Sequence, residues 1–179
     1  AMTQAMLGDL LAAVTGPAPQ ALILTGVGRV FSAGADLEEM QAGLGVDPVW
    51  EQVSGAIAAL PCLTIAALNG TLAGGAMGIV LACDLRIAVP SAKIFYPVMK
   101  LGFLPQPSDA ARLTVLVGPA RAKMILMAGV RIDATEARDW GLIDRVVDPS
   151  ALLTEAGLLA GDVLAASLAH VAAVKRLVR

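Results

Sequence analysis

Two short turns rich in small residues are the first candidates for chemistry in this sequence. Ser32–Ala35 follows the apolar run Ala21–Leu24, and Ala73–Ala76 follows the apolar run Leu63–Leu68. Small side chains let a ligand approach the backbone closely, and the first N–H groups of a helix have no partner within it. If both turns leave one edge of a parallel sheet and enter helices, two N–H donors could stabilise negative charge on one oxygen. On the pattern alone, the simpler alternative is that the glycines only permit tight turns and close packing.

Other kinds of site have little support. The glycines after Ala21–Leu24 do not complete a dinucleotide-binding fingerprint, because Phe31 stands where the third glycine is needed. The single histidine, His170, and the cysteines Cys62 and Cys83, which lie in apolar runs, predict neither a metal site nor a disulfide framework. A net charge of −2 and a content of two Trp, one Tyr and three Phe argue against a nucleic-acid partner.

The elements that must position the two turns follow from hydrophobic periodicity. With 179 residues, of which 57% are hydrophobic and 16% charged, the chain is long and apolar enough for one globular domain. Strands alternate with helices, which predicts an α/β fold with a mostly parallel sheet covered by helices. Strands are expected at 21–24, 63–68, 85–89, 93–96 and 145–147. Helices are expected at 2–14, 48–60, 75–83, 109–117, 121–127 and from 151 onward, with interruptions at Gly157 and Gly161. Acidic residues predict a first helical turn at 36–40, and a capping-box pattern at 133–136 predicts a short helix that Gly141 ends.

Several of these segments also resemble a known family. They are Phe31–Met40, Ile65–Gly70, Ala73–Gly75, Ala82–Ala88, Lys100–Pro105 and Gly141–Val147. In this order they resemble the enoyl-CoA hydratase/isomerase (crotonase) family over essentially the whole chain. The resemblance implies a spiral of ββα turns that binds acyl-CoA thioesters and stabilises a thioester enolate. It divides the chain into a crotonase-like core at 1–149 and the start of a C-terminal helical region at 150–179. The strands that open the family's fold and the helices that close it have no counterpart, so we expect a fragment or an incompletely recorded chain.

Site residues can be carried over from the resemblance one at a time. The oxyanion-hole donors would be the backbone N–H groups of Ala35 and Gly75, which favours the chemical interpretation of the two turns over the simpler one. Arg29 stands where the family often has a basic residue near the CoA phosphates, although a solvated surface charge explains it equally well. The residues that would line the CoA path are Ala33, Asp36 and Leu37.

The carboxylates of the family are missing at the expected positions. Hydratases of this family use two glutamates, one three residues after Gly75 and one directly after Pro97. Those places are occupied by Gly78 and Val98. A further position, used by some isomerases just after the Leu-Pro turn, is Gln106. Activity as a two-glutamate hydratase is therefore doubtful.

Two acids lie between residues 52 and 132. Asp84 belongs to a family motif and is expected to form a structural ion pair or cap. Asp109 is the one carboxylate near the expected pocket, where it could act as a general acid or base with a raised pKa. The alternative, which is the more economical, is that Asp109 caps the following helix or pairs with Arg112. Tyr96 could donate a hydrogen bond to a substrate, but a packed core tyrosine is the simpler interpretation.

Three hypotheses follow. The first is a crotonase-fold enzyme of the enoyl-CoA hydratase/isomerase type, the second a protein of the same fold that binds acyl-CoA without turning it over, and the third a structural subunit without a ligand. The missing glutamates favour the second over a true hydratase, and the two turns oppose the third. No cofactor is expected, because CoA enters as part of the substrate. We also expect a cytoplasmic protein without membrane contact that forms a homotrimer or a dimer of trimers.

Overall fold

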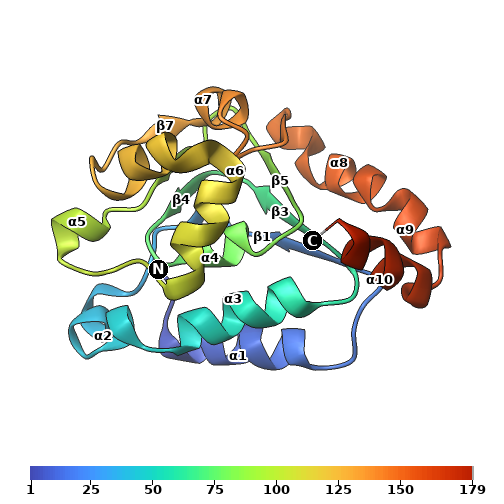
Figure 1. Cartoon of the computed structure of the whole chain (residues 1–179), viewed down its shortest axis with the longest axis horizontal. Coiled ribbons are helices and arrows are strands. Elements are labelled where there is room, and N and C mark those ends of the chain that lie inside the picture. The colour runs from blue at the N-terminus through green and yellow to red at the C-terminus, as the bar shows by residue number, and fades with distance from the viewer. Residues whose placement is uncertain (179) are drawn as a thin grey trace.

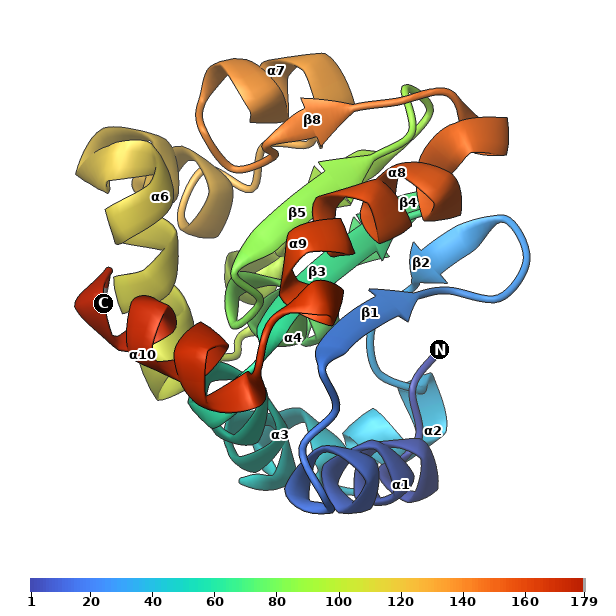
Figure 2. The same cartoon turned by 90° about the vertical axis from the view of Figure 1, so that its right-hand side faces the viewer.

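Two four-stranded sheets form the centre of the structure, a computed structural model that describes residues 1–178. The first sheet is entirely parallel and has the order β1 (Ala21–Thr25), β3 (Leu63–Leu68), β5 (Leu85–Ala88) and β8 (Arg145–Val146). The second has the order β2 (Val30–Ser32), β4 (Thr71–Ala73), β6 (Lys93–Phe95) and β7 (Ile132–Asp133), of which only β7 runs antiparallel to its neighbour. Figure 2 shows the first sheet crossing the molecule with helix α8 over β3 and β5.

The helices surround these sheets. They are α1 (Gln4–Thr15), α2 (Leu37–Gln41), α3 (Val49–Ala59), α4 (Ala76–Leu81), α5 (Val98–Leu101), α6 (Pro107–Leu126), α7 (Ala134–Asp139), α8 (Leu152–Leu159), α9 (Gly161–Ala165) and α10 (Leu168–Leu177), with 3-10 turns at Leu44–Val46 and Pro149–Ala151. Helices α1 and α3 lie side by side, and α4 packs between α3 and α6 (Figure 1). Among residues 1–178 no single helix could cross a membrane, and only the pair Pro149–Ala165 and Leu168–Leu177, bent by 109°, has the length and composition together.

The chain repeats a unit of strand, short strand and helix. β1 leads through β2 to α2, and β3 leads through β4 to α4. This confirms the predicted α/β class and the spiral of ββα turns, while the expectation of one sheet was wrong. The strands β2 and β4 escaped prediction because each has three residues, too few to show a period of two.

Local signals placed most helix ends correctly. Asp36 caps α2, since its carboxylate accepts hydrogen bonds from the amides of Glu38 and Glu39, and Asp133 caps α7 in the same way. The break expected between the helical segments 109–117 and 121–127 is present, because α6 is kinked at Gly118, whose backbone is non-helical (φ +78°). One difference concerns the helix breaks after residue 151. The C-terminal region breaks at Ala160 and again at Ala166, whose backbone is extended.

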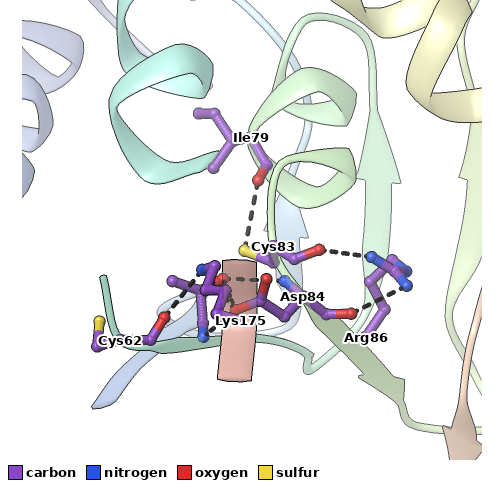
Figure 3. A network of polar contacts seen from close by, with 7 residues as sticks. Cys62, Ile79, Cys83, Asp84, Arg86 and Lys175 are labelled. Atoms are coloured by element: carbon purple, nitrogen blue, oxygen red, sulfur yellow. Dashed lines mark hydrogen bonds and ion pairs between the residues drawn. The ribbon is translucent and has the colours of Figure 1, made fainter. Parts of the chain in front are cut away.

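A polar network ties the C-terminal helix to the first sheet (Figure 3). The Lys175 ammonium donates to an Asp84 carboxylate oxygen at 2.7 Å and to the Cys62 carbonyl at 2.8 Å. The same oxygen of Asp84 accepts from the amide and the hydroxyl of Thr64 at 2.9 and 3.0 Å. Asp84 therefore holds α10 against β3, as the expected structural ion pair. Cys62 and Cys83 are free thiols in the core.

Candidate active site

A cavity lies where the two small-residue turns meet. It has a volume of about 120 Å³. Its wall takes in Ala33, Gly34 and Ala35 from the first turn and Ala73, Gly74 and Gly75 from the second. The remaining wall is largely apolar and consists of Leu37, Met40, Gly45, Trp50, Phe95, Tyr96, Pro97, Val98, Leu101, Phe103, Leu104 and Gln106.

The turns meet because their preceding strands are parallel neighbours. β2 and β4 pair with Ser32 opposite Leu72, so both strands deliver the chain to the same edge of the second sheet. Gly34 and Gly74 have φ values of +94° and +62°, a region that side-chain-bearing residues rarely adopt. A Cβ atom on Gly74 would lie 3.3 Å from the Cα of Gly34. Glycine at both positions therefore lets the two turns touch.

Both predicted donor amides are free of protein acceptors. Within residues 1–178, neither the Ala35 N–H nor the Gly75 N–H donates a hydrogen bond to the protein. The neighbouring bonds, from the Met2 amide to the Gly34 carbonyl and from the Asp36 amide to the Met2 carbonyl, both 2.8 Å, hold the Ala35 segment in place. Gly75 directly precedes α4, where helix geometry leaves the first amides unpaired. Their assignment as oxyanion donors stays a prediction, but the two residues do line one cavity.

Trp50 packs closely against Gly75. Its indole N–H donates to the Leu44 carbonyl at 2.8 Å, and the side chain is 3% exposed. A Cβ atom on Gly75 would lie 3.1 Å from the Trp50 ring. A side chain at this position would therefore need the ring to shift by a few tenths of an ångström, whereas glycine fits without a shift.

The other residues predicted for the CoA path divide into two groups. Ala33 and Leu37 line the cavity and are exposed at its mouth. Asp36 does not line it, since its carboxylate caps α2. Arg29 is exposed in the loop between β1 and β2, away from the cavity wall. Its role toward CoA phosphates stays a prediction.

No carboxylate belongs to the wall of this cavity. Val98 and Gln106, at two of the positions where the resemblance implied an acid, both line it. Gly78, at the third, lies one turn of helix after Gly75 and does not reach the wall. The polar side chains of the wall are those of Trp50, Tyr96 and Gln106. Elsewhere in residues 1–178, no group of three or more His, Cys, Asp or Glu side chains is arranged to hold a metal ion.

Asp109 lies behind the cavity wall rather than in it. Its side chain enters from the first turn of α6, is 1% exposed, and accepts a hydrogen bond from the Tyr96 hydroxyl at 2.9 Å. The other carboxylate oxygen has no hydrogen-bond partner among the described residues. The Asp109 side chain thus does not cap α6 and does not form an ion pair with Arg112. Both of the simpler structural roles expected from the sequence were therefore wrong.

Burial controls the electrostatics of this pair. Loss of water raises the pKa of Asp109 from its ordinary 3.8 to about 6, with a smaller contribution in the same direction from Glu51. The hydrogen bond from the Tyr96 hydroxyl and the charge of Arg112 lower the pKa of Asp109. Burial and the charge of Asp109 also raise the pKa of Tyr96 well above its usual range. Asp109 therefore titrates near neutrality, where a proton-transfer group is most useful.

Tyr96 is the functional candidate that sequence reasoning treated as core packing. It is 5% exposed, as a core tyrosine would be, yet it lines the cavity and is bonded to the buried carboxylate. The available signal was its position directly before Pro97 as the one tyrosine of the chain. That signal could not reveal the partner, which is thirteen residues away on another element.

Comparison with known proteins agrees with this architecture. The chain is 38% identical over 154 residues to a crotonyl-CoA hydratase of Syntrophomonas wolfei, with 83% of this chain and 59% of the relative covered. It is 37% identical over 147 residues to an enoyl-CoA isomerase/hydratase of Mycosarcoma maydis, with 76% and 52% covered. The chain thus spans between half and two thirds of the length of these relatives.

Solved structures give the same result. An enoyl-CoA hydratase from Bacillus anthracis superimposes with a TM-score of 0.88 at 33% identity, over 99% of this chain and 72% of that one. The family model that describes enoyl-CoA hydratase/isomerase matches residues 1–179. With the two touching turns, the parallel sheets and these matches together, the chain belongs to the enoyl-CoA hydratase/isomerase family.

Proposed function

We propose that the cavity binds the thioester group of an acyl-CoA and stabilises its enolate. In this proposal the thioester oxygen lies between the N–H groups of Ala35 and Gly75, and the CoA portion leaves past Ala33 and Leu37. The observation that carries the proposal is that both amides belong to one cavity and neither has an acceptor in the described chain. Donors held in advance at such a position contribute about 3–4 kcal/mol each to stabilising an oxyanion.

The reaction that we propose differs from hydration, because the carboxylates that hydration needs are missing at the expected positions. Hydration of a 2-enoyl-CoA needs a group that deprotonates water and a group that protonates the α carbon, and each such group contributes about 10²–10⁴-fold. Val98 and Gln106 can supply neither step. We therefore expect enolate formation and proton exchange at the α carbon, with hydration of crotonyl-CoA far slower than in a relative with two glutamates.

Binding without turnover is the second candidate. It is favoured by the largely apolar cavity wall, which carries no carboxylate. The two candidates differ in whether the bound thioester becomes an enolate. Acetoacetyl-CoA is a suitable probe, because its enolate absorbs in the ultraviolet and forms more readily when an oxyanion is stabilised.

The experiment compares two substitutions of Gly75. Both Gly75→Ala and Gly75→Pro add a Cβ atom against Trp50, but only the proline removes the N–H donor. The φ of −59° at this position suits proline. We expect the enolate signal to fall by about 10²–10³-fold more in Gly75→Pro than in Gly75→Ala. Equal signals in the two variants would refute the oxyanion hole, and binding without any enolate signal in the wild type would favour the second candidate. Ala35→Pro provides an independent donor deletion.

A further inference from the structure

The Asp109 carboxylate fills the space beside Gly78. A Cβ atom built on Gly78 would lie 2.4 Å from Oδ1 of Asp109 and 3.0 Å from its Cγ. No side chain at position 78 could share this space with the carboxylate as it stands. A carboxylate is therefore present one helical turn beyond Gly75, but it enters from α6 instead of from α4.

Tyr96 connects this carboxylate to the cavity wall. Asp109 and Gly78 are both absent from the cavity wall, whereas Tyr96 is part of it. The Tyr96 hydroxyl is bonded to Oδ2 of Asp109 at 2.9 Å. Among the residues that line the cavity, Tyr96 is the one with an ionisable side chain. Tyr96 is thus the residue that both belongs to the cavity wall and bonds to Asp109, which makes its hydroxyl the candidate proton carrier between the two.

Stability does not explain the pair. A buried carboxylate that keeps one oxygen unpaired loses hydration without full compensation, which costs about 1–3 kcal/mol or more for a charged group. Ser108 Oγ and Arg112 Nη1, on the same first turns of α6, are also buried without a partner in the described chain. Uncompensated polar groups of this kind concentrate at functional sites.

We propose that Tyr96 and Asp109 form the proton-transfer pair of this site, with Tyr96 meeting the bound acyl group and Asp109 positioned behind it. The inference rests on the proposed binding of an acyl-CoA thioester. When an enolate is protonated, the Tyr96 O–H bond breaks and a C–H bond forms at the α carbon, while the enolate electron pair restores the thioester carbonyl. The protonated Asp109 carboxyl replaces the proton on the tyrosine oxygen and becomes a carboxylate. The reverse sequence removes the α proton and leaves Asp109 protonated.

The relay overcomes the weakness of each partner. An isolated buried tyrosine is a poor acid near neutrality, because burial raises its pKa. In the relay the net donor or acceptor is Asp109, whose pKa of about 6 is matched to neutral conditions. The other charged groups that face Asp109 are Glu51 from α3 and Arg112 from α6. The Ser108 amide donates a hydrogen bond to the Glu51 carboxylate at 3.3 Å. The charge of Glu51 raises the pKa of Asp109, whereas the charge of Arg112 lowers it.

The test measures exchange of the α protons of butanoyl-CoA with solvent in D2O, by mass spectrometry, on the full chain. Asp109→Asn and Tyr96→Phe keep the shapes of the two side chains, and Asp139→Asn, on the exposed end of α7, is the matched control. We expect each of the first two variants to lose about 10²-fold or more of the exchange rate, with the double variant no slower than the singles. The dissociation constant for butanoyl-CoA, measured by calorimetry, should change less than about threefold in either variant, a span below about 0.7 kcal/mol.

The pH profile separates a chemical role from a structural one. In the wild type the exchange rate should rise through about pH 6 as Asp109 loses its proton, and this inflection should vanish in Asp109→Asn. Binding of butanoyl-CoA by the wild type without exchange overturns the relay. An exchange rate in Asp109→Asn or Tyr96→Phe within about threefold of the wild-type rate overturns it too. Neither result contradicts the proposed thioester binding. Absence of binding overturns both. Because Tyr96→Phe retains the packed ring, it remains informative if Asp109→Asn folds poorly.

Discussion

Gly78 and Asp109 should be strongly coupled in stability, because they compete for one space. Alanine at position 78 places its Cβ atom 2.4 Å from Oδ1 of Asp109, so the carboxylate must move and give up its bond to Tyr96. A hydrogen bond to a charged group contributes about 1.5–3 kcal/mol. Against this loss, replacing glycine by alanine inside a helix stabilises by about 1 kcal/mol. Gly78→Ala alone should therefore destabilise the fold by about 0.5–2 kcal/mol.

The sign should reverse when the carboxylate is absent. In an Asp109→Ala background the three atoms nearest to the added Cβ are removed, and Gly78→Ala should stabilise by about 0.5–1 kcal/mol through helix propensity. The double-mutant cycle then gives a coupling of about 1–3 kcal/mol, measured from urea unfolding of the four proteins followed by circular dichroism. Gly157→Ala on α8, where a Cβ atom has nothing within 4 Å, is the control for helix propensity. A coupling below about 0.5 kcal/mol would falsify the placement of the carboxylate beside Gly78.

Four further outcomes are expected. The folded pKa of Asp109 lies above its ordinary 3.8, at about 6, so its contribution favours folding below pH 3.8 and is lost as pH rises through 6. At about 1.4 kcal/mol per pH unit, wild type should lose up to about 3 kcal/mol relative to Asp109→Asn across that window, and parallel stability curves would contradict this. Lys175→Met leaves Asp84 and the Cys62 carbonyl without their ammonium donor and should cost about 1–3 kcal/mol in urea unfolding, whereas an unchanged midpoint would show that the network is dispensable. Burial raises the pKa of Cys83 to about 12 and also raises that of Cys62, so neither thiol should react with an aromatic disulfide reagent at pH 8 until the chain unfolds. We propose a homotrimer or dimer of trimers, which sedimentation would contradict by giving a stable monomer at micromolar concentration.

Local patterns in the sequence determined much of the fold. The apolar runs Leu63–Leu68 and Ala21–Leu24 are neighbouring parallel strands, as expected for short buried runs between helices. Asp36 and Asp133 mark helix starts, because a carboxylate that bonds amides two or three residues ahead acts within one turn. The two small-residue turns were equally visible as a local feature, whereas the assignment of Ala35 and Gly75 as oxyanion donors came from the family resemblance.

Short elements were decided by the tertiary structure. β2 and β4 have three residues each and are stabilised by pairing with each other and, for β4, with β6. A strand of that length shows no usable periodicity and has little stability alone. The second sheet can therefore be recognised only in the tertiary structure. The pairing of β2 with β4 is also what brings Gly34 and Gly74 into contact.

The acid at the site depended on the tertiary structure for the same reason. The sequence by itself identified Asp109 as the carboxylate closest to the expected pocket and showed that position 78 carries no side chain. It contained no sign that these two facts belong together, because they concern residues on different helices. Packing of α4 between α3 and α6 brings Gly78 against Asp109, and the segment after β6 brings the Tyr96 hydroxyl to the same carboxylate. Periodicity and capping act over a few residues, whereas the crossing of two helices depends on every contact in the core, so no local pattern could specify it.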